Sequence, residues 1–145
     1  MLIKFFSPVY LHNFASMNIE SYISQLLYRH QCVTVPGFGA FLTELQSSKW
    51  NENNNTFSPP KKIVFFNSFL QNNDGLLANF ISVKEKITYE EGVICIQQSV
   101  NNWKNQLLEN KSLVLSEIGV ISVNNEGNLI FEPQTQINYN TYSFG

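Results

Sequence analysis

The chain has 145 residues, of which 43% are hydrophobic and only 14% charged, and its net charge is −2. This length allows one sizeable core or two small ones, and the acidic balance excludes the strongly basic field of a non-specific nucleic-acid binder. The two cysteines are too few for a disulfide framework, and no run approaches the roughly 18 apolar residues of a membrane span.

The N-terminal part predicts an extended leader followed by a helix. Residues 1–16 have an apolar patch that Pro8 interrupts, which makes them a poor secretory signal. Asn18 is a good N-cap residue, and the apolar residues after it follow the spacing of one helical face. These are Ile19, Tyr22, Ile23, Leu26 and Leu27. We therefore expect a helix over residues 19–27.

The next stretch predicts a β-hairpin built on a glycine turn. An apolar run at 32–35 reaches Gly37-Phe38-Gly39, and a second run follows at 40–45. Because glycine accepts a positive φ, we expect Gly37 and Gly39 to form the turn, with Gly39 at a positive φ. Residues 46–58 are rich in Asn and Ser and indicate a long mobile hairpin tip, after which 61–66 is expected to be a largely buried strand.

Two further helices are predicted after this hairpin. A short helix is expected from Leu76 to an end near residues 83–86, and Thr88 with Glu91 forms a capping box that opens the longest helix. Its apolar residues recur at intervals of three and four positions and form a heptad-like seam. Such a seam must pack against a partner along the length of the helix. They are Val93, Ile96, Val100, Trp103 and Leu107. We expect this seam to pack against the helix at 19–27.

The chain contains an internal repeat. Residues 33–43 return as 113–123, with Gly119 in the place of Gly39, and each copy follows a helical segment. A Phe-x-Pro sequence lies further on in each copy, at 57–59 and 131–133. The repeated unit is thus helix, strand, glycine turn, strand and extended tail. Residues 137–145 alternate enough to form a closing strand.

No pattern indicates catalysis, a cofactor or a metal. The sequence contains no nucleophile motif and no paired-histidine metal box. Pro36-Gly37-Phe38-Gly39 lies between predicted strands and lacks the following helix that a phosphate loop needs. Glu90 and Glu91 are first-turn helix residues, which are typical solvated charges. We therefore expect a non-enzymatic protein.

The chain resembles the HU/IHF superfamily of bacterial DNA-architectural proteins, in which this turn is typically Gly-Phe-Gly-x-Phe. Residues 37–41 match that turn, whereas 117–121 read Glu-Ile-Gly-Val-Ile. The chain is still more similar to the tandem CCDC-type HU-like domains at the N-terminus of bacterial SPOR-domain proteins. The motifs that carry this second resemblance lie at 27–30, 35–41, 72–79 and 143–145.

The resemblance implies an α+β fold of two HU-like units in a pseudo-two-fold arrangement, a pseudo-dimer within one chain. We expect the leader at 1–16, the first unit at 17–72 and the second at 73–145. HU and IHF embrace DNA with two β-arms, which implies a sequence-independent contact to double-stranded DNA. A SPOR region after residue 145 would link this cytoplasmic segment to the cell envelope, and the segment itself would not contact the membrane.

Departures from the family leave two functions open. The predicted arm at 46–58 has only Lys49 as a positive charge, so that Lys49, Lys61 and Lys62, with Trp50 as a stacking side chain, are the candidate nucleic-acid contacts. Clustering of these residues on one face would favour DNA. The alternative is a protein-interaction module that has lost the basic arms. An exposed patch of Val64, Phe66 and Phe69 would favour a protein partner.

Overall fold

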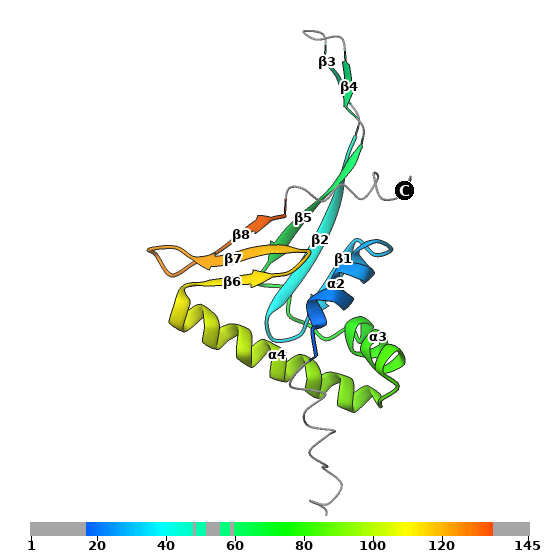
Figure 1. Cartoon of the computed structure of the whole chain (residues 1–145), viewed down its shortest axis with the longest axis vertical. Coiled ribbons are helices and arrows are strands. Elements are labelled where there is room, and N and C mark those ends of the chain that lie inside the picture. Colours follow the sequence, from blue (N-terminus) through cyan, green and yellow to red (C-terminus); the bar gives the residue numbers. More distant parts are fainter. Residues whose placement is uncertain (1–16, 48, 52–55, 59, 135–145) are drawn as a thin grey trace, which may run out of the picture.

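The computed structural model describes residues 17–47, 49–51, 56–58 and 60–134, with the backbone only at 49–51 and 56–58. The predicted leader at 1–16 and the predicted closing strand at 137–145 lie outside the described residues. The fold is α+β, as expected. Two three-stranded antiparallel sheets lie over the helices, and one long hairpin projects away from this body (Figure 1).

The first sheet contains β1 (Cys32–Val35), β2 (Gly39–Gln46) and β5 (Lys61–Asn67), in that order. The hairpin of β2 and β5 continues into a ribbon of β3 (Lys49–Asn51) and β4 (Thr56–Ser58). The register does not change, because Gln46 pairs with Lys61 and Lys49 with Ser58. The tip predicted as a mobile loop is therefore a paired arm over these residues. Its directly opposed Trp50 and Phe57 are residue types that favour strand pairing.

The second sheet contains β6 (Ser112–Leu115), β7 (Gly119–Val123) and β8 (Leu129–Pro133), in the same order. A tight turn joins β7 to β8. The Asn124 side-chain oxygen accepts hydrogen bonds from the backbone N–H groups of Glu126 and Asn128, each at 2.9 Å. The second unit therefore has a short turn where the first unit has its arm.

The two glycine turns are structural equivalents. Phe38 N–H donates to the Val35 carbonyl at 3.0 Å, and Ile118 N–H donates to the Leu115 carbonyl at 3.0 Å. In the same way, Thr43 N–H donates to the Gln31 carbonyl, and Val123 N–H donates to the Lys111 carbonyl. In each pair of bonds, the two donor residues are as far apart in the sequence as Gly39 and Gly119. The equivalent bonds therefore confirm the internal repeat.

Gly39 was predicted to have a positive φ, but the structure requires glycine at this position for another reason. The positive φ belongs to Gly37, at 81°, and its counterpart Glu117 adopts a φ of 70°. Gly39 is needed for space, because an added Cβ would collide with the Phe66 ring. At Gly119 an added Cβ would collide with the Glu132 carbonyl oxygen. Both glycines thus allow the close approach of a neighbouring strand.

The two units meet at a pair of equivalent phenylalanines. Phe66 pairs with Phe41 on β2, and Phe131 pairs with Ile121, the counterpart of Phe41, on β7. The Phe66 and Phe131 ring centroids lie 6.2 Å apart, where β5 faces β8. Contact between equivalent residues is what a two-fold axis produces. The counterpart of Phe131 is therefore Phe66, and the repeated Phe-x-Pro sequence was misleading, since Phe57 lies in the arm.

The helices within the described residues are α2 (Ile19–Leu27), α3 (Leu76–Glu85) and α4 (Tyr89–Asn110). Asn18 caps α2 and the Thr88–Glu91 capping box opens α4, as predicted. The left-handed residue that ends α4 is Lys111, at a φ of 62°.

The predicted apolar seam of α4 faces the core. Trp103 packs on Phe38 of the β1–β2 turn, with ring centroids 5.0 Å apart. The main helical partner of α4 is α3, and α4 also packs against β6. The prediction named α2 as the partner instead. A solvent-accessible cavity lies between the start of α2 and α4.

Candidate functional site

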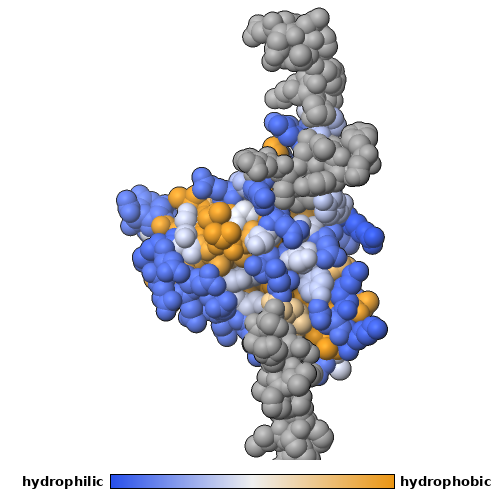
Figure 2. All heavy atoms as spheres, viewed as in Figure 1, coloured by the Kyte–Doolittle hydropathy of each residue, from blue (hydrophilic) through white to orange (hydrophobic). Residues whose placement is uncertain are grey.

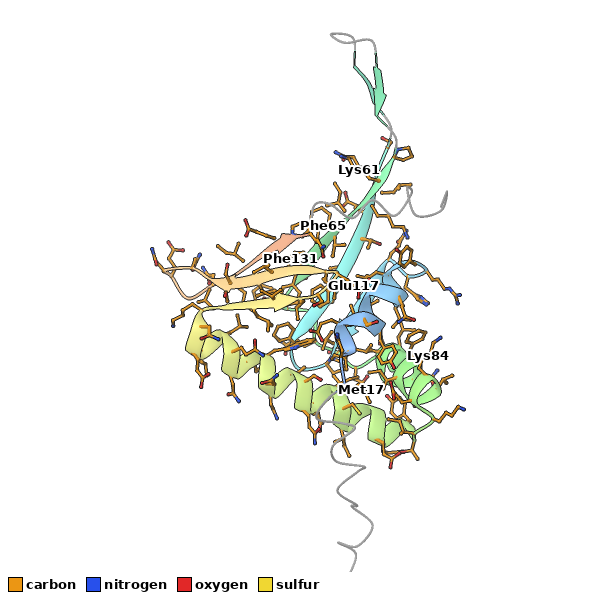
Figure 3. The ribbon with its side chains drawn as sticks, in the orientation of Figure 1. Met17, Lys61, Phe65, Lys84, Glu117 and Phe131 are labelled. Carbon is orange, nitrogen blue, oxygen red and sulfur yellow. The ribbon has the colours of Figure 1, made fainter. Side chains whose placement is uncertain are left out.

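The arm carries two of the four predicted nucleic-acid contacts. Lys49 and Trp50 lie on β3, and their side chains are outside the described residues. Lys61 begins β5 at the base of the arm, where its side chain is exposed (Figure 3). Lys61 and Lys62 are neighbours in one strand, so their side chains leave opposite faces of the ribbon. A single face that carries both lysines is therefore not formed.

The Lys62 ammonium group is bound to the end of α2. Its Nζ donates to the Tyr28 carbonyl oxygen at 2.9 Å and to the Leu27 carbonyl oxygen at 3.3 Å. The last carbonyl groups of a helix lack intrahelical partners and carry partial negative charge. Lys62 thus closes the C-terminus of α2 against the first sheet, and a phosphate contact would have to replace these bonds.

The outer face of the second sheet has an apolar cluster beside Ser112 and Ser122. By register, Val114, Val120 and Ile130 share the side of the sheet that faces away from the core. Val114 is 67% exposed, and Figure 2 shows apolar side chains over these strands. The charged residue of this face is Glu132, which pairs with Val120. Such a face has no cation to offer to a phosphate.

The exposed patch of Val64, Phe66 and Phe69 that would favour a protein partner does not form. Val64 is buried in the core, and Phe66 packs between the rings of Phe38 and Phe41. β5 is also less buried than predicted, because Phe65 lies on its outer face and is exposed (Figure 3). Phe69 alone of these three residues is exposed, at 92%.

Phe69 lies at the rim of a groove where four segments of the chain meet. The groove has a volume of about 610 Å³. It is bounded by the β1–β2 turn, the loop after β5, the last turns of α4 and the β7–β8 hairpin. Its apolar lining comprises Phe38, Phe69, Leu107, Leu108, Val123 and Leu129. Lys104 and Lys111 also line it, and none of its described lining residues is acidic. We call this site the lysine-flanked groove.

No sequence pattern predicted this groove. Lys104 and Leu108 share one face of α4, Lys111 is its C-cap residue, and Leu108 is 74% exposed. An exposed leucine between two lysines on an otherwise amphipathic helix was the available signal. The remaining walls come from segments far apart in the sequence, and their meeting cannot be deduced from spacing.

Titratable groups are buried mainly between the helices. The Tyr22 hydroxyl donates to the Glu85 carboxylate, and burial, followed by this bond, raises the pKa of Tyr22 to about 12. Burial raises the pKa of the Cys95 thiol to about 11, which disfavours the nucleophilic thiolate. Among the described residues, no group of three or more His, Cys, Asp or Glu could hold a metal ion. No helix in that part of the chain is long and apolar enough to cross a membrane.

Comparison with protein families agrees with this fold. Residues 17–74 match the family described as CCDC81-like prokaryotic HU domain 1, and residues 75–144 match CCDC81-like prokaryotic HU domain 2. Neither the curated proteins nor the solved structures gave a match to the chain. The two matches divide the chain between the arm-bearing first sheet and the second sheet with its two helices. The chain therefore contains two CCDC81-like prokaryotic HU domains in tandem.

Proposed function

We propose that this tandem of HU domains is a non-enzymatic protein-binding module, and that the lysine-flanked groove holds an acidic, apolar segment of its partner. HU-like domains serve DNA binding or protein interaction. The observation that carries the proposal is Phe69, a large apolar side chain 92% exposed beside a groove with an apolar floor. Exposed aromatic side chains beside apolar pockets are typical anchors of protein interfaces.

The charges of the groove specify the partner. Lys104 lies on α4 and Lys111 is the C-cap residue seven positions later, so about two helical turns, or about 10 Å, separate their backbones. Leu108 lies between them on the same helical face. We expect a partner segment with a large apolar side chain against Leu108 and Phe69, and with a carboxylate on each side of it. Such charges would steer association and fix orientation.

Peptide selection against the chain tests this proposal. A displayed random peptide library should yield sequences with Asp or Glu on both sides of a large apolar residue. A selected peptide, measured by fluorescence polarisation, should bind Phe69→Ser or Leu108→Ser at least about tenfold more weakly, because each removes an apolar contact that the bound peptide would bury. Leu45→Ser is the matched control, since Leu45 is an exposed apolar residue outside the groove.

A charge reversal makes the test sharper. With Lys104→Glu and Lys111→Glu together, a second selection should favour Lys and Arg at the flanking positions. Both lysines are exposed, so the folded state should persist. Selected peptides without acidic residues, or equal binding to wild type and Phe69→Ser, would refute the groove as the binding site.

A second function, weak binding of duplex DNA, is favoured by the arm. The ribbon of β3 and β4 keeps the register of β2 and β5, so that Lys49 and Lys61 lie along one extended hairpin. Lys49 and Lys61 are the expected phosphate contacts, with Trp50 beside Lys49 on the same strand. A titration of duplex DNA at low salt tests this function, and no binding under that condition would exclude it.

We also propose that the module is the cytoplasmic part of an envelope protein, in which a membrane anchor and a SPOR region follow. The resemblance of the motifs at 35–41 and 72–79 to SPOR-domain proteins supports this. The coding sequence downstream of residue 145 is the direct test. An apolar span of about 20 residues and a small C-terminal domain are expected there, and their absence would contradict the proposal.

A further inference from the structure

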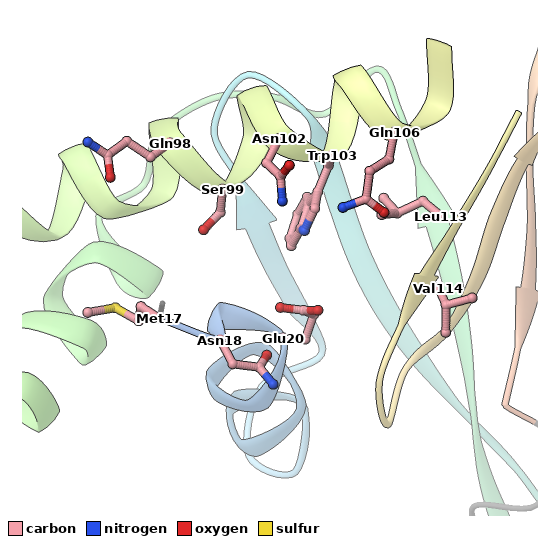
Figure 4. Close-up of a pocket in the computed structure, with 10 residues that line it drawn as sticks. All are labelled: Met17, Asn18, Glu20, Gln98, Ser99, Asn102, Trp103, Gln106, Leu113 and Val114. Atoms are coloured by element: carbon pink, nitrogen blue, oxygen red, sulfur yellow. The ribbon is translucent and has the colours of Figure 1, made fainter. Parts of the chain in front are cut away.

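A second cavity, unrelated to the lysine-flanked groove, lies between the first turn of α2 and the middle of α4. Its volume is about 490 Å³, within the range of about 300–1,000 Å³ that is common for sites of small ligands. Figure 4 shows Trp103 and Asn102 projecting from α4 toward α2, with Glu20 on the opposite wall. The cavity therefore joins a wall from the first domain to a wall from the second.

Trp103 gives this cavity an unused hydrogen-bond donor. The residue is only 4% exposed, and Phe38 covers it on the side of the core. Among the described residues, its indole N–H makes no hydrogen bond. Buried donors are almost always paired, and an unpaired one has a substantial cost in free energy. A group with a carbonyl oxygen in the cavity would remove that cost.

Glu20 supplies the negative charge on the opposite wall. Its carboxylate makes no ion pair with any described residue, and no lysine, arginine or histidine lines the cavity. Burial raises the pKa of Glu20, while a hydrogen bond to its own backbone acts in the opposite direction. A partly buried carboxylate without a counter-ion is a site for a cation that donates hydrogen bonds.

We infer that the cavity binds a basic residue of a peptide, with its cationic group on Glu20 and a main-chain carbonyl on the indole N–H of Trp103. The side chains of Gln98, Asn102 and Gln106 line the same space and suit a peptide backbone, because an amide both donates and accepts. The indole is too deeply buried to offer its face to a stacked ring. The ligand is thus distinguished by two features at once, a positive charge and a neighbouring carbonyl group.

The two tryptophans of the chain provide the readout. In a ¹H–¹⁵N spectrum of the full chain, the indole resonances of Trp50 and Trp103 can be assigned with Trp50→Phe. Titration with N-acetyl-lysine N′-methylamide should shift the Trp103 indole resonance saturably and leave that of Trp50 unchanged. Glu20→Gln should weaken this binding about tenfold or more, because a charge-assisted hydrogen bond is lost. Glu44→Gln, on an exposed glutamate outside the cavity, should not.

Two further binding measurements test the site. Asn102→Leu removes an amide from an exposed helical position without a large change in volume, so it should weaken binding in a chain that still folds. n-Butylamine has the ammonium group but no carbonyl, and equal binding of this amine would overturn the assignment to a peptide. An unshifted Trp103 resonance, an equal shift with N-acetyl-glutamate N′-methylamide, or unchanged binding by Glu20→Gln would overturn the site itself.

Discussion

The two glycine turns allow a matched test of the fold, in which Gly39→Ala, Gly119→Ala and Gly37→Ala are compared. Gly39 and Gly119 are equivalent positions of the repeat, and Gly37 lies in the same turn as Gly39. The three positions differ in what an added methyl group meets. At Gly39 it meets the Phe66 ring, and at Gly119 it meets the Glu132 carbonyl oxygen and, at 2.8 Å, the Phe131 ring. At Gly37 nothing lies within 4 Å, and the cost comes from the φ of 81° alone.

These surroundings set the order of the three effects. Gly37→Ala should lower the free energy of unfolding by about 1 kcal/mol, the cost of a left-handed alanine. Gly39→Ala should cost about 2 kcal/mol, since overpacking forces the Phe66 ring to move against its neighbours. Those neighbours hold it at centroid distances of 5.4 Å from Phe38 and 5.0 Å from Phe41. Gly119→Ala should cost about 3 kcal/mol or more, because backbone must shift.

Urea unfolding of the three variants measures these costs, and a second substitution tests the cause. Phe66→Leu shortens the side chain that an alanine at position 39 would strike. The double variant Gly39→Ala with Phe66→Leu should therefore be more stable than the sum of the single effects by at least about 0.5 kcal/mol. Phe131→Leu should rescue Gly119→Ala much less, since the Glu132 carbonyl remains. Additive effects at Gly39, or equal costs at Gly37 and Gly119, would refute the steric explanation.

Three further outcomes follow from individual contacts. Lys62→Met should lower the free energy of unfolding by about 1–2 kcal/mol through loss of its bonds to the end of α2, whereas Lys61→Met should be nearly neutral in the same urea series. Thr88→Ala should cost about 1 kcal/mol by removing the capping box of α4, which circular dichroism during thermal unfolding will measure. Burial and the bond to Glu85 raise the pKa of Tyr22 from 10.0 to about 12, so the stability that Tyr22 adds is complete below pH 10 and is lost as the pH rises through about 12. The difference in unfolding free energy between wild type and Tyr22→Phe should shrink over that window, and a constant difference would contradict the role of this bond.

Local signals explain which parts of the fold could be predicted. The helical face of α2 and the capping box of α4 depend on residues three or four positions apart, and both were confirmed. The repeat could be recognised in the sequence because Gly39 and Gly119 each lie between two similar apolar runs. The arm was missed as a paired ribbon because its Asn-rich composition is typical of loops, whereas backbone pairing extends from β2 and β5 with the register unchanged.

Long-range contacts explain what the sequence could not predict. The position of Lys62 on β5 gives no sign that its ammonium group reaches the end of α2, more than thirty residues earlier. Phe66 and Phe69 look alike as exposed candidates, but one faces the core between two aromatic rings and the other faces solvent. The lysine-flanked groove and the cavity at Trp103 both require segments from two domains. The roles of Lys49, Trp50 and Lys61 in DNA binding remain predictions.

The hydrogen bonds of Lys62 lead to a quantitative prediction for duplex DNA. Three phosphate contacts from Lys49, Lys61 and Lys62 would give a slope of about −2.7 in a plot of log affinity against log salt concentration, but two contacts give about −1.8. Because Lys62 is bound to the carbonyl groups of Leu27 and Tyr28, we expect the smaller slope. Lys49→Gln and Lys61→Gln should each reduce its magnitude by about 0.9 units, whereas Lys62→Gln should leave it unchanged and lower only the stability. Fluorescence anisotropy of a labelled duplex between about 20 and 200 mM salt measures these slopes, a range in which a sequence-independent phosphate contact is still detectable. A wild-type slope near −2.7, reduced equally by Lys62→Gln and Lys61→Gln, would show that DNA displaces Lys62 from α2 and that the bonds seen in the free chain do not decide its role.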